Sequence, residues 1–399
     1  MDEKTTGMLS GFKVVDMTGV VFGPLATQIL ADFGAEVIRV EGPGGEVLRP
    51  VMPPKNAAGM AAVFMAFNRG KKSIMLDLRD PEDAAVMRDL LKDADVFIHN
   101  VRLKGVERLG FGYDAVRKLN PEIIYVHASG FGEGGPYADL QAYDDIIQSA
   151  SGAATLLPRV EGNPQPRFLP SLIADKAAGL TAVYATMAAI IHRMRTGKGQ
   201  FVEVPMFETF SKFMLQEHLG GQYYNPPTGP VGYQRQLDPD RQPCPTKDGY
   251  IAFLPNRMPQ WQPIFEVLGD PNYLQRHGLH TDTDIRAAQP QIYKDVRDLT
   301  ILQTSSHWVQ ALRAVGVPCM AVRDLGDMLD DPHLNAVGFF DRHDHPSEGR
   351  VNDIVEPCRF SDWTPVQPSP APQLDEHGKT IRAAVDRGQN NDLGNANDN

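Results

Sequence analysis

The chain has 399 residues, of which 42% are hydrophobic and 22% are charged. This is a globular composition, and the length suffices for two or three domains with their own cores. The 39 Lys and Arg face 50 Asp and Glu, which gives a net charge of −11. This balance argues against nucleic acid or an anionic membrane surface as the main partner.

Three cysteines occur, at Cys244, Cys319 and Cys358, and they show no C-x-x-C spacing. We therefore expect neither a disulfide framework nor a structural zinc site. No apolar run approaches the roughly 20 residues of a membrane span, and the N-terminus lacks the basic-then-apolar pattern of a signal peptide. A cytoplasmic protein is the resulting expectation.

The first 135 residues alternate between strand-like and helix-like patterns. Strands are predicted at 12–17, 37–40, 73–78, 96–99 and 123–126, and helices at 24–33, 81–92 and 113–119. Such alternation predicts parallel pairing in an open α/β sheet. Ligands of such sheets bind beyond the carboxyl ends of the strands.

The next region reads as a helix over 176–195, apolar nearly all round and hence buried, then a strand at 201–204 and a helix at 207–219. Proline-rich and glycine-rich loop sequence follows over 223–245. A second unit starts near residue 248, with a strand to 253 and helices at 261–268 and 296–315. The polar tail over 386–399 has little to bury, so we expect disorder there.

The first candidate site is a nucleotide-binding turn. Gly19 and Gly23 flank the first strand–helix turn, and Glu41 ends the second strand as a ribose-binding acid would. The full G-x-G-x-x-G pattern is absent, because bulky Val and Phe stand where a pyrophosphate needs close backbone approach. NAD binding is therefore disfavoured, although a Rossmann-like fold is not.

The second candidate is a set of basic residues at loop ends. Arg69 to Lys72 precede the third strand, and Arg102, Lys104 and Arg108 follow the fourth. Arg and Lys are the usual ligands of phosphate, so the set predicts a pocket for a phosphorylated ligand. Solvated loops are the alternative, and spacing alone does not separate the two.

The third candidate is Asp175, which opens the long apolar helix. An acid there accepts backbone N–H bonds and meets the positive end of the helix dipole, which keeps it ionised. Such a carboxylate is a possible nucleophile. Spacing alone favours a plain helix cap.

The fourth candidate is the glycine-rich loop at 130–136, which follows a predicted strand at the binding edge. It either lets a ligand approach the backbone or only makes a turn. The histidines show no H-x-x-x-H spacing, so we expect no metal.

Several stretches in order resemble the class III CoA-transferases, a family that includes α-methylacyl-CoA racemase. They are Leu9-Ser-Gly-Phe-Lys-Val-Val-Asp16, Gly34-Ala-Glu-Val-Ile-Arg-Val-Glu41, Asn68-Arg-Gly-Lys-Lys-Ser-Ile74, Asn100-Val-Arg102, Arg108-Leu-Gly110, Gly130-Phe-Gly-Glu-Gly-Gly-Pro-Tyr137, Tyr143-Asp-Asp-Ile-Ile-Gln148 and Arg195-Thr-Gly-Lys-Gly-Gln200. The resemblance spans about residues 9–380.

The resemblance implies that Asp175 is the nucleophile of a CoA-transferase and carries an aspartyl-CoA thioester. It implies a CoA site lined by Lys72, Asn100, Arg102, Arg108 and Tyr143, with acyl-CoA as a substrate and no permanently bound cofactor. The loop at 130–135 is the expected source of backbone N–H groups for the oxyanions.

Two other functions stay open. A racemase of this family uses a His where Tyr143 stands, and a phenol with a pKa of about 10 is a poor base at neutral pH. A non-catalytic acyl-CoA binder would have no need of Asp175. The glycine run of formyl-CoA:oxalate transferases is missing from 229–245, which puts oxalate in doubt, and the acids remain unspecified.

The resemblance also implies an interlocked homodimer. In it a Rossmann-like large domain comes from both chain ends, here 1–222 and 331–385, and a small α+β domain at 223–330 is inserted between them. The site forms between the large domain of one subunit and the small domain of the other.

Overall fold

The computed structural model describes residues 7–255, 258–363 and 368–386. The chain divides into two compact units. The large unit comprises Met1–Ala153, Phe168–Met214 and Ala336–Asn399, and the small unit comprises Ala154–Arg167 and Leu215–Asn335. The predicted small domain at 223–330 lies within the small unit, and the predicted disordered tail lies almost entirely outside the described residues.

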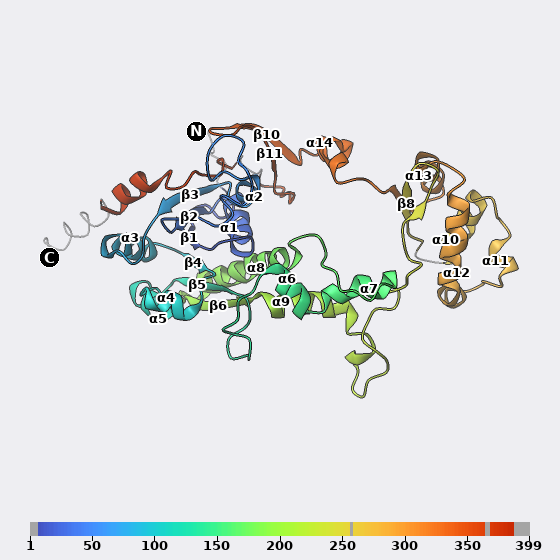
Figure 1. The fold of residues 1–399 in the computed structure, drawn as a ribbon, viewed down its shortest axis with the longest axis horizontal. Coiled ribbons are helices and arrows are strands. Elements are labelled where there is room, and N and C mark those ends of the chain that lie inside the picture. Colours follow the sequence, from blue (N-terminus) through green and yellow to red (C-terminus); the bar gives the residue numbers. More distant parts are fainter. Residues whose placement is uncertain (1–6, 256–257, 364–367, 387–399) are drawn as a thin grey trace. The chain divides into compact units, whose positions relative to one another are not determined.

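A six-stranded parallel sheet forms the centre of the large unit (Figure 1). Its strands are β1 Lys13–Met17, β2 Glu36–Glu41, β3 Lys71–Met75, β4 Val96–His99, β5 Ile124–Ser129 and β6 Gln200–Pro205. The spatial order β3-β2-β1-β4-β5-β6 confirms the predicted open α/β sheet. The order reverses between β1 and β4, and such a switch point is where open α/β sheets bind ligands.

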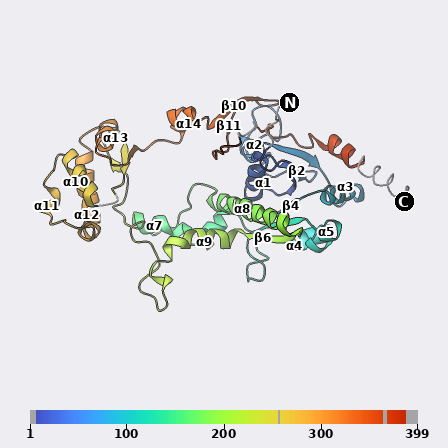
Figure 2. The same ribbon diagram turned by 180° about the vertical axis from the view of Figure 1, so that it is seen from behind.

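Helices cover both faces of this sheet, as Figures 1 and 2 show from opposite sides. One buried cluster joins α1 Phe22–Asp32 and α8 Ile173–Thr196 to inward side chains of β1, β2, β4 and β5. A second cluster joins α3 Pro81–Lys92 and α5 Tyr113–Leu119 to the opposite face. The large unit also contains α2 Ala62–Ala66, α4 Leu103–Arg108, α6 Asp144–Ala150 and the antiparallel pair β10 Phe340–His345 and β11 Gly349–Ile354.

Local sequence signals explain two of the helix ends. Asp80 caps α3, where its Oδ1 accepts from the backbone N–H groups of Glu82 (2.8 Å) and Asp83 (3.2 Å). Gly34 follows α1 with φ of 98°, a conformation that favours glycine. The strand predicted at 73–78 begins two residues earlier, at Lys71. The prediction missed this start because two lysines stand at positions where a buried strand is expected to have apolar residues.

The long helix α8 is not buried on all sides, so that prediction is wrong. Leu180, Tyr184, Ile191 and Met194 are each more than half exposed. Their spacing of four, seven and three residues puts them in one stripe along the helix. The opposite side, with Ala178, packs into the sheet cluster. A stripe of large apolar side chains is therefore left uncovered by the single chain.

The small unit is built around its own core. An antiparallel sheet of β7 Cys244–Pro245, β8 Tyr250–Phe253 and β9 Cys319–Ala321 accompanies the helices α7 Leu156–Glu161, α10 Met258–Val267, α11 Tyr273–Arg276, α12 Asp282–Thr300 and α13 Ser305–Ala314. Helix α9 Met206–His218 and helix α14 Pro332–Ala336 each run from one unit into the other. Among the described residues, no helix is long and apolar enough to cross a bilayer.

The predicted helix at 296–315 is in fact two helices. Helix α12 starts early because Thr281 and Asp284 form a reciprocal capping box. Thr304 then caps α13 by accepting from the backbone N–H of His307 at 3.3 Å.

Candidate active site

Asp175 lies in the first turn of α8 and is only 5% exposed. It receives a hydrogen bond from the backbone of Phe22, the first residue of α1. The two helices approach closely at Gly179, where an added Cβ would lie 3.0 Å from both the carbonyl oxygen of Phe22 and Cδ2 of Leu25. This close packing places the carboxyl group of Asp175 beside the start of α1.

A second aspartate, Asp144, holds the start of α8. Its Oδ2 accepts from the backbone N–H groups of Ala174 (2.8 Å) and Asp175 (3.1 Å), and its Oδ1 accepts from Nε2 of Gln148 (2.5 Å). The helix cap predicted for the side chain of Asp175 is thus supplied by Asp144. In the sequence, Asp144 stands out only as part of a family motif, and its spacing from residue 174 does not predict this role.

The surroundings of Asp175 disfavour its charge. Burial and the nearby Asp144 raise the pKa of Asp175 and the hydrogen bond from Phe22 lowers it, so that the pKa is about 7. The sequence prediction that the helix start keeps this group ionised is therefore wrong, because desolvation outweighs the helix dipole. At neutral pH the carboxyl group is balanced between its two forms, as is typical of functional groups.

A clamp spans the switch point of the sheet beside Asp175. Asn100 follows β4, and its side chain accepts from the N–H of Gly19 (3.0 Å) and donates to the carbonyl of Gly19 (2.9 Å). The next residue, Val20, has φ of 69°, which is strained for a β-branched residue. Its N–H donates to Oε1 of Glu46 at 2.7 Å. Asn100 and Glu46 thus fix the loop that leads into Phe22.

A buried ionic cluster anchors the other end of this loop. Oδ1 of Asp16 accepts from the backbone N–H of Thr18 (2.9 Å), and its Oδ2 accepts from Nζ of Lys71 (3.1 Å) and Oγ1 of Thr27 (2.6 Å). Nη1 of Arg39 lies 3.6 Å from the same Oδ2. Although burial opposes ionisation, Lys71 and Arg39 hold the pKa of Asp16 below its usual value. The loop is therefore fixed at both ends.

Three of the predicted CoA-binding residues, Asn100, Arg102 and Arg108, line one pocket of about 960 Å³ at the carboxyl ends of β4 and β5. Lys104 lines it too and pairs with Asp139 at 2.9 Å. The other lining residues are Val101, Leu103, Gly105, Glu107, His127, Ser129, Gly130, Glu133, Ala138 and Leu140. The volume lies within the range of small-molecule pockets.

The other two predicted CoA-binding residues do not line this pocket. Lys72 lies on β3 and pairs with Glu36 at a different hollow of the large unit. Tyr143 precedes α6 and is 58% exposed. The lysine beside Lys72, Lys71, is buried in the ionic cluster instead, and burial lowers its pKa to about 8.

Two backbone N–H groups of the glycine-rich loop are already hydrogen-bonded to side chains. The N–H of Gly132 donates to Oε1 of Glu208 (3.0 Å), and the N–H of Glu133 donates to Oε1 of Glu203 (2.9 Å). These two groups are engaged in this conformation, so they are not the oxyanion donors here.

One group among the described residues has the composition of a metal site. Ligand atoms of His127, Glu133 and Glu203 lie within 4.8 Å of one another. Burial lowers the pKa of His127 to about 4, which leaves its imidazole neutral. Glu203 already accepts hydrogen bonds from Ser129 and Glu133, however, so we assign no metal to this group.

The matches to known proteins decide the family. The model of CoA-transferase family III matches residues 9–378. The chain belongs to CoA-transferase family III. Its sequence is 31% identical to "Succinate--glutarate CoA-transferase" of Agrobacterium fabrum over 95% of this chain and 96% of that protein. It is 29% identical to "Acetyl-CoA:oxalate CoA-transferase" of Acetobacter aceti over 95% of this chain and 96% of that protein.

The fold matches that family as well. A CAIB/BAIF family protein from Brucella suis superposes with a TM-score of 0.82 and 31% identity, covering 95% of this chain and 100% of that one. The protein is thus an enzyme of the class III CoA-transferase type, for which acyl-CoA is a substrate. The two named relatives act on different acids, so identity near this level does not fix the acid.

Proposed function

We propose that this family III CoA-transferase transfers CoA through a covalent intermediate on Asp175. The observation that carries the proposal is a buried carboxyl group held beside the start of α1, with no Lys or Arg paired to it within residues 7–255, 258–363 and 368–386. A buried carboxyl group without a cation is costly to ionise, so such groups are typically kept for chemistry.

The transfer proceeds in four balanced steps. The Asp175 carboxylate attacks the thioester carbonyl of the donor, which forms a mixed anhydride and releases CoA thiolate. The thiolate attacks the aspartyl carbonyl, which forms an aspartyl-CoA thioester and releases the donor acid. The acceptor carboxylate attacks the aspartyl carbonyl of this thioester, which forms a second mixed anhydride and releases CoA thiolate again. The thiolate then attacks the acyl carbonyl, which yields the new acyl-CoA and regenerates Asp175.

The pocket lined by Asn100, Arg102 and Arg108 is the proposed CoA site. Guanidinium groups match phosphate oxygens in pairs, and Arg102 and Arg108 are both exposed to the pocket. Lys72 and Tyr143 remain candidates on the family resemblance alone, because neither lines the pocket.

The proposed assembly is a homodimer of the interlocked kind. The apolar stripe of α8, formed by Leu180, Tyr184, Ile191 and Met194, supports it, since large uncovered apolar stripes indicate an interface. Because interlocked chains cannot separate once folded, Leu180→Glu is expected to block assembly during folding, so that the expressed variant lacks the dimer species in analytical ultracentrifugation. His192→Glu, at an exposed position on another side of the same helix, is the matched control, and a wild-type monomer would refute the assembly.

The test of the covalent step is intact-protein mass spectrometry after incubation with a panel of acyl-CoA donors and hydroxylamine. Hydroxylamine converts an aspartyl thioester into a hydroxamate, a small mass gain on the peptide that carries residue 175. The gain is expected in the wild type and absent from Asp175→Ala. Asp145→Ala removes an exposed carboxylate on α6 and is expected to label normally.

Other outcomes would redirect the assignment. Deuterium uptake at the acyl α-carbon without any mass gain would indicate a racemase. CoA binding with neither signal would indicate a binder. Label on another carboxylate in the Asp175→Ala protein would show that the nucleophile lies elsewhere.

A further inference from the structure

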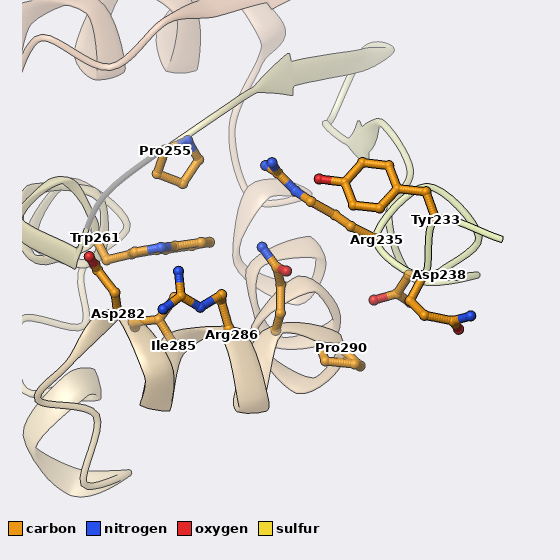
Figure 3. Close-up of a pocket in the computed structure, with 11 residues that line it drawn as sticks. Tyr233, Arg235, Asp238, Pro255, Trp261, Asp282, Ile285, Arg286 and Pro290 are labelled. Carbon is orange, nitrogen blue, oxygen red and sulfur yellow. The ribbon is translucent and has the colours of Figure 1, made fainter. Parts of the chain in front are cut away.

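A second pocket lies wholly within the small unit (Figure 3). Its volume is about 520 Å³, within the range of small-molecule sites. It is lined by Tyr233, Gln234, Arg235, Asp238, Pro255, Trp261, Asp282, Ile285, Arg286, Gln289 and Pro290. The lining thus combines two arginines and two amides with aromatic and aliphatic walls.

The two arginines of this pocket are uncommitted. Nε of Arg235 is buried and has no hydrogen-bond partner. In the part of the chain that the structure describes, no carboxylate pairs with Arg235 or Arg286. Other arginines of the small unit are engaged, since Arg276 binds Asp270 (2.6 Å) and Arg297 binds Asp240 (2.7 Å). A buried guanidinium N–H without a partner is costly, so Nε of Arg235 indicates an absent acceptor, whereas Arg286 is exposed to solvent.

The pocket is also built from firmly joined parts. Arg235 comes from the loop before β7, and Arg286 from the second turn of α12. Arg297, farther along α12, ties that loop down by donating to the carbonyl oxygen of Asp240 (2.8 Å) and to its Oδ1 (2.7 Å). Trp261, only 2% exposed, lies beside Arg286, as Figure 3 shows.

The aromatic lining, rather than the net charge, selects the kind of anion. Asp238 and Asp282 also line the pocket, and Oδ1 of Asp238 accepts from the N–H of Asp240 at 2.9 Å. Among the described lining residues, two arginines face two aspartates. The large-unit pocket likewise has three basic residues, Arg102, Lys104 and Arg108, against the acidic Glu107, Glu133 and Asp139, so net charge does not distinguish the two pockets. The aromatic wall suits an apolar body behind the carboxylate.

We propose that Arg235 and Arg286 bind the carboxylate of a small organic acid, whose apolar body packs on Trp261 and Tyr233. The proposal rests on the proposed function for its choice of ligand, because free carboxylic acids are substrates of CoA transfer. It makes the small unit a determinant of which acid the enzyme accepts.

The test measures binding to the full-length Asp175→Ala protein, in which the proposed transfer cannot occur. Glutarate, hexanoate and benzoate are titrated by calorimetry and tryptophan fluorescence, with neutral glutaramide and inorganic phosphate as comparison arms. At least one acid is expected to saturate the protein, glutaramide is not, and phosphate is expected to bind at least tenfold more weakly. Arg235→Gln and Arg286→Gln should each weaken the binding of the acid at least tenfold.

Two variants check the location. Arg276→Gln removes an arginine of the same unit that is already paired, so the affinity should not change. Trp261→Phe should keep calorimetric binding but lose most of the fluorescence change, which also shows that the pocket is folded. The proposal is overturned if no acid binds, if the acid binds the two glutamine variants as tightly as the parent, or if phosphate binds more tightly than every acid.

These outcomes are separable from those of the proposed function. Hydroxylamine labelling of the wild type with no acid binding would overturn the pocket alone. Acid binding without labelling would overturn the covalent mechanism and leave the pocket.

Discussion

The polar groups around Asp175 and those of the small-unit pocket differ in how many hydrogen bonds and ion pairs they make within the chain. In the large unit, Asp16, Asn100 and Asp144 each make two or more hydrogen bonds within the chain. In the small unit, Arg235 and Arg286 form no ion pair with any of the residues that the structure describes. Polar groups that are hydrogen-bonded within the chain position the backbone and the nucleophile, whereas charged groups without an ion pair are available to a ligand. The contrast separates positioning residues from binding residues.

The largest expected effect concerns the two adjacent lysines of β3. Lys71→Met leaves Asp16 buried with one cation fewer, so we expect a loss of about 3–5 kcal/mol in the free energy of unfolding. Lys72→Met breaks a half-exposed pair with Glu36 and should cost about 1 kcal/mol or less. Urea denaturation of both variants measures the difference, and equal losses would contradict the buried cluster.

The Lys72→Met variant also tests the family resemblance. A rise in the KM for acyl-CoA with unchanged stability would return Lys72 to the CoA site. An unchanged KM would leave it as a surface residue of β3, consistent with its pairing to Glu36.

The next effect concerns the clamp on Gly19. Asn100→Ala removes both hydrogen bonds to Gly19, so the loop beside Asp175 loses its register and labelling should slow by roughly 10–100-fold. Asn120→Ala also removes two bonds to backbone carbonyls, those of Leu91 and Ala94, but far from the clamp. It should lower stability without slowing the labelling, and similar slowing in both variants would refute a positioning role.

A smaller effect is the pH-dependent contribution of Asp175 to the free energy of unfolding. Its pKa is about 7 in the folded state, against 3.8 as the ordinary value, so the folded state holds this proton more tightly. Stability from this group is therefore present at acid pH and is lost as the pH rises from about 4 to 7. Asp175→Asn should be more stable than the wild type at pH 8 by on the order of 2 kcal/mol.

Thermal unfolding of both proteins at pH 5 and pH 8 measures that difference. The gain should appear mainly at pH 8. Asp145→Asn, at an exposed position, should show no such pH dependence, and an equal gain for Asp175→Asn at both pH values would contradict the raised pKa.

The smallest effect concerns the charge of Asp144 and its influence on the pH dependence of labelling at Asp175. Labelling by acyl-CoA needs the ionised form of Asp175, so its rate should rise with pH through a midpoint near 7. Asp144→Asn removes a like charge, which favours ionisation, so the midpoint should move down by about one pH unit. Stopped-flow release of CoA thiol measures the profile. Asp145→Asn serves as the control, and a midpoint that moves upward in Asp144→Asn would reverse the argument.

Much of the large unit is predictable because its signals are local. The alternating apolar strands, the cap at Asp80 and the glycine after α1 all give the right elements. The start of β3 is misplaced because the charge of Lys71 hides a strand position that only the partner Asp16, 55 residues away, makes tolerable. The start of α12 is missed although Thr281 and Asp284 signal it, since Pro290 reads as a helix breaker.

The site is less predictable than the fold for a physical reason. Asp175 can be found from sequence, but its pKa depends on burial and on Asp144, which is brought near by tertiary packing. Asn100 is found as a family residue, yet its bonds to Gly19 depend on the neighbouring positions of β1 and β4 in the sheet. The pocket at Arg235 and Arg286 joins two separate segments and has no sequence pattern of its own.

The left-handed backbone at Val20 also has a consequence for protein engineering. A glycine there would relieve the steric conflict and so stabilise the folded state. It would also widen the range of conformations open to the loop beside Asp175. Stabilising this enzyme and preserving its rate therefore make opposite demands on one residue. A search for more heat-resistant variants should leave Val20 unchanged and alter positions remote from the clamp.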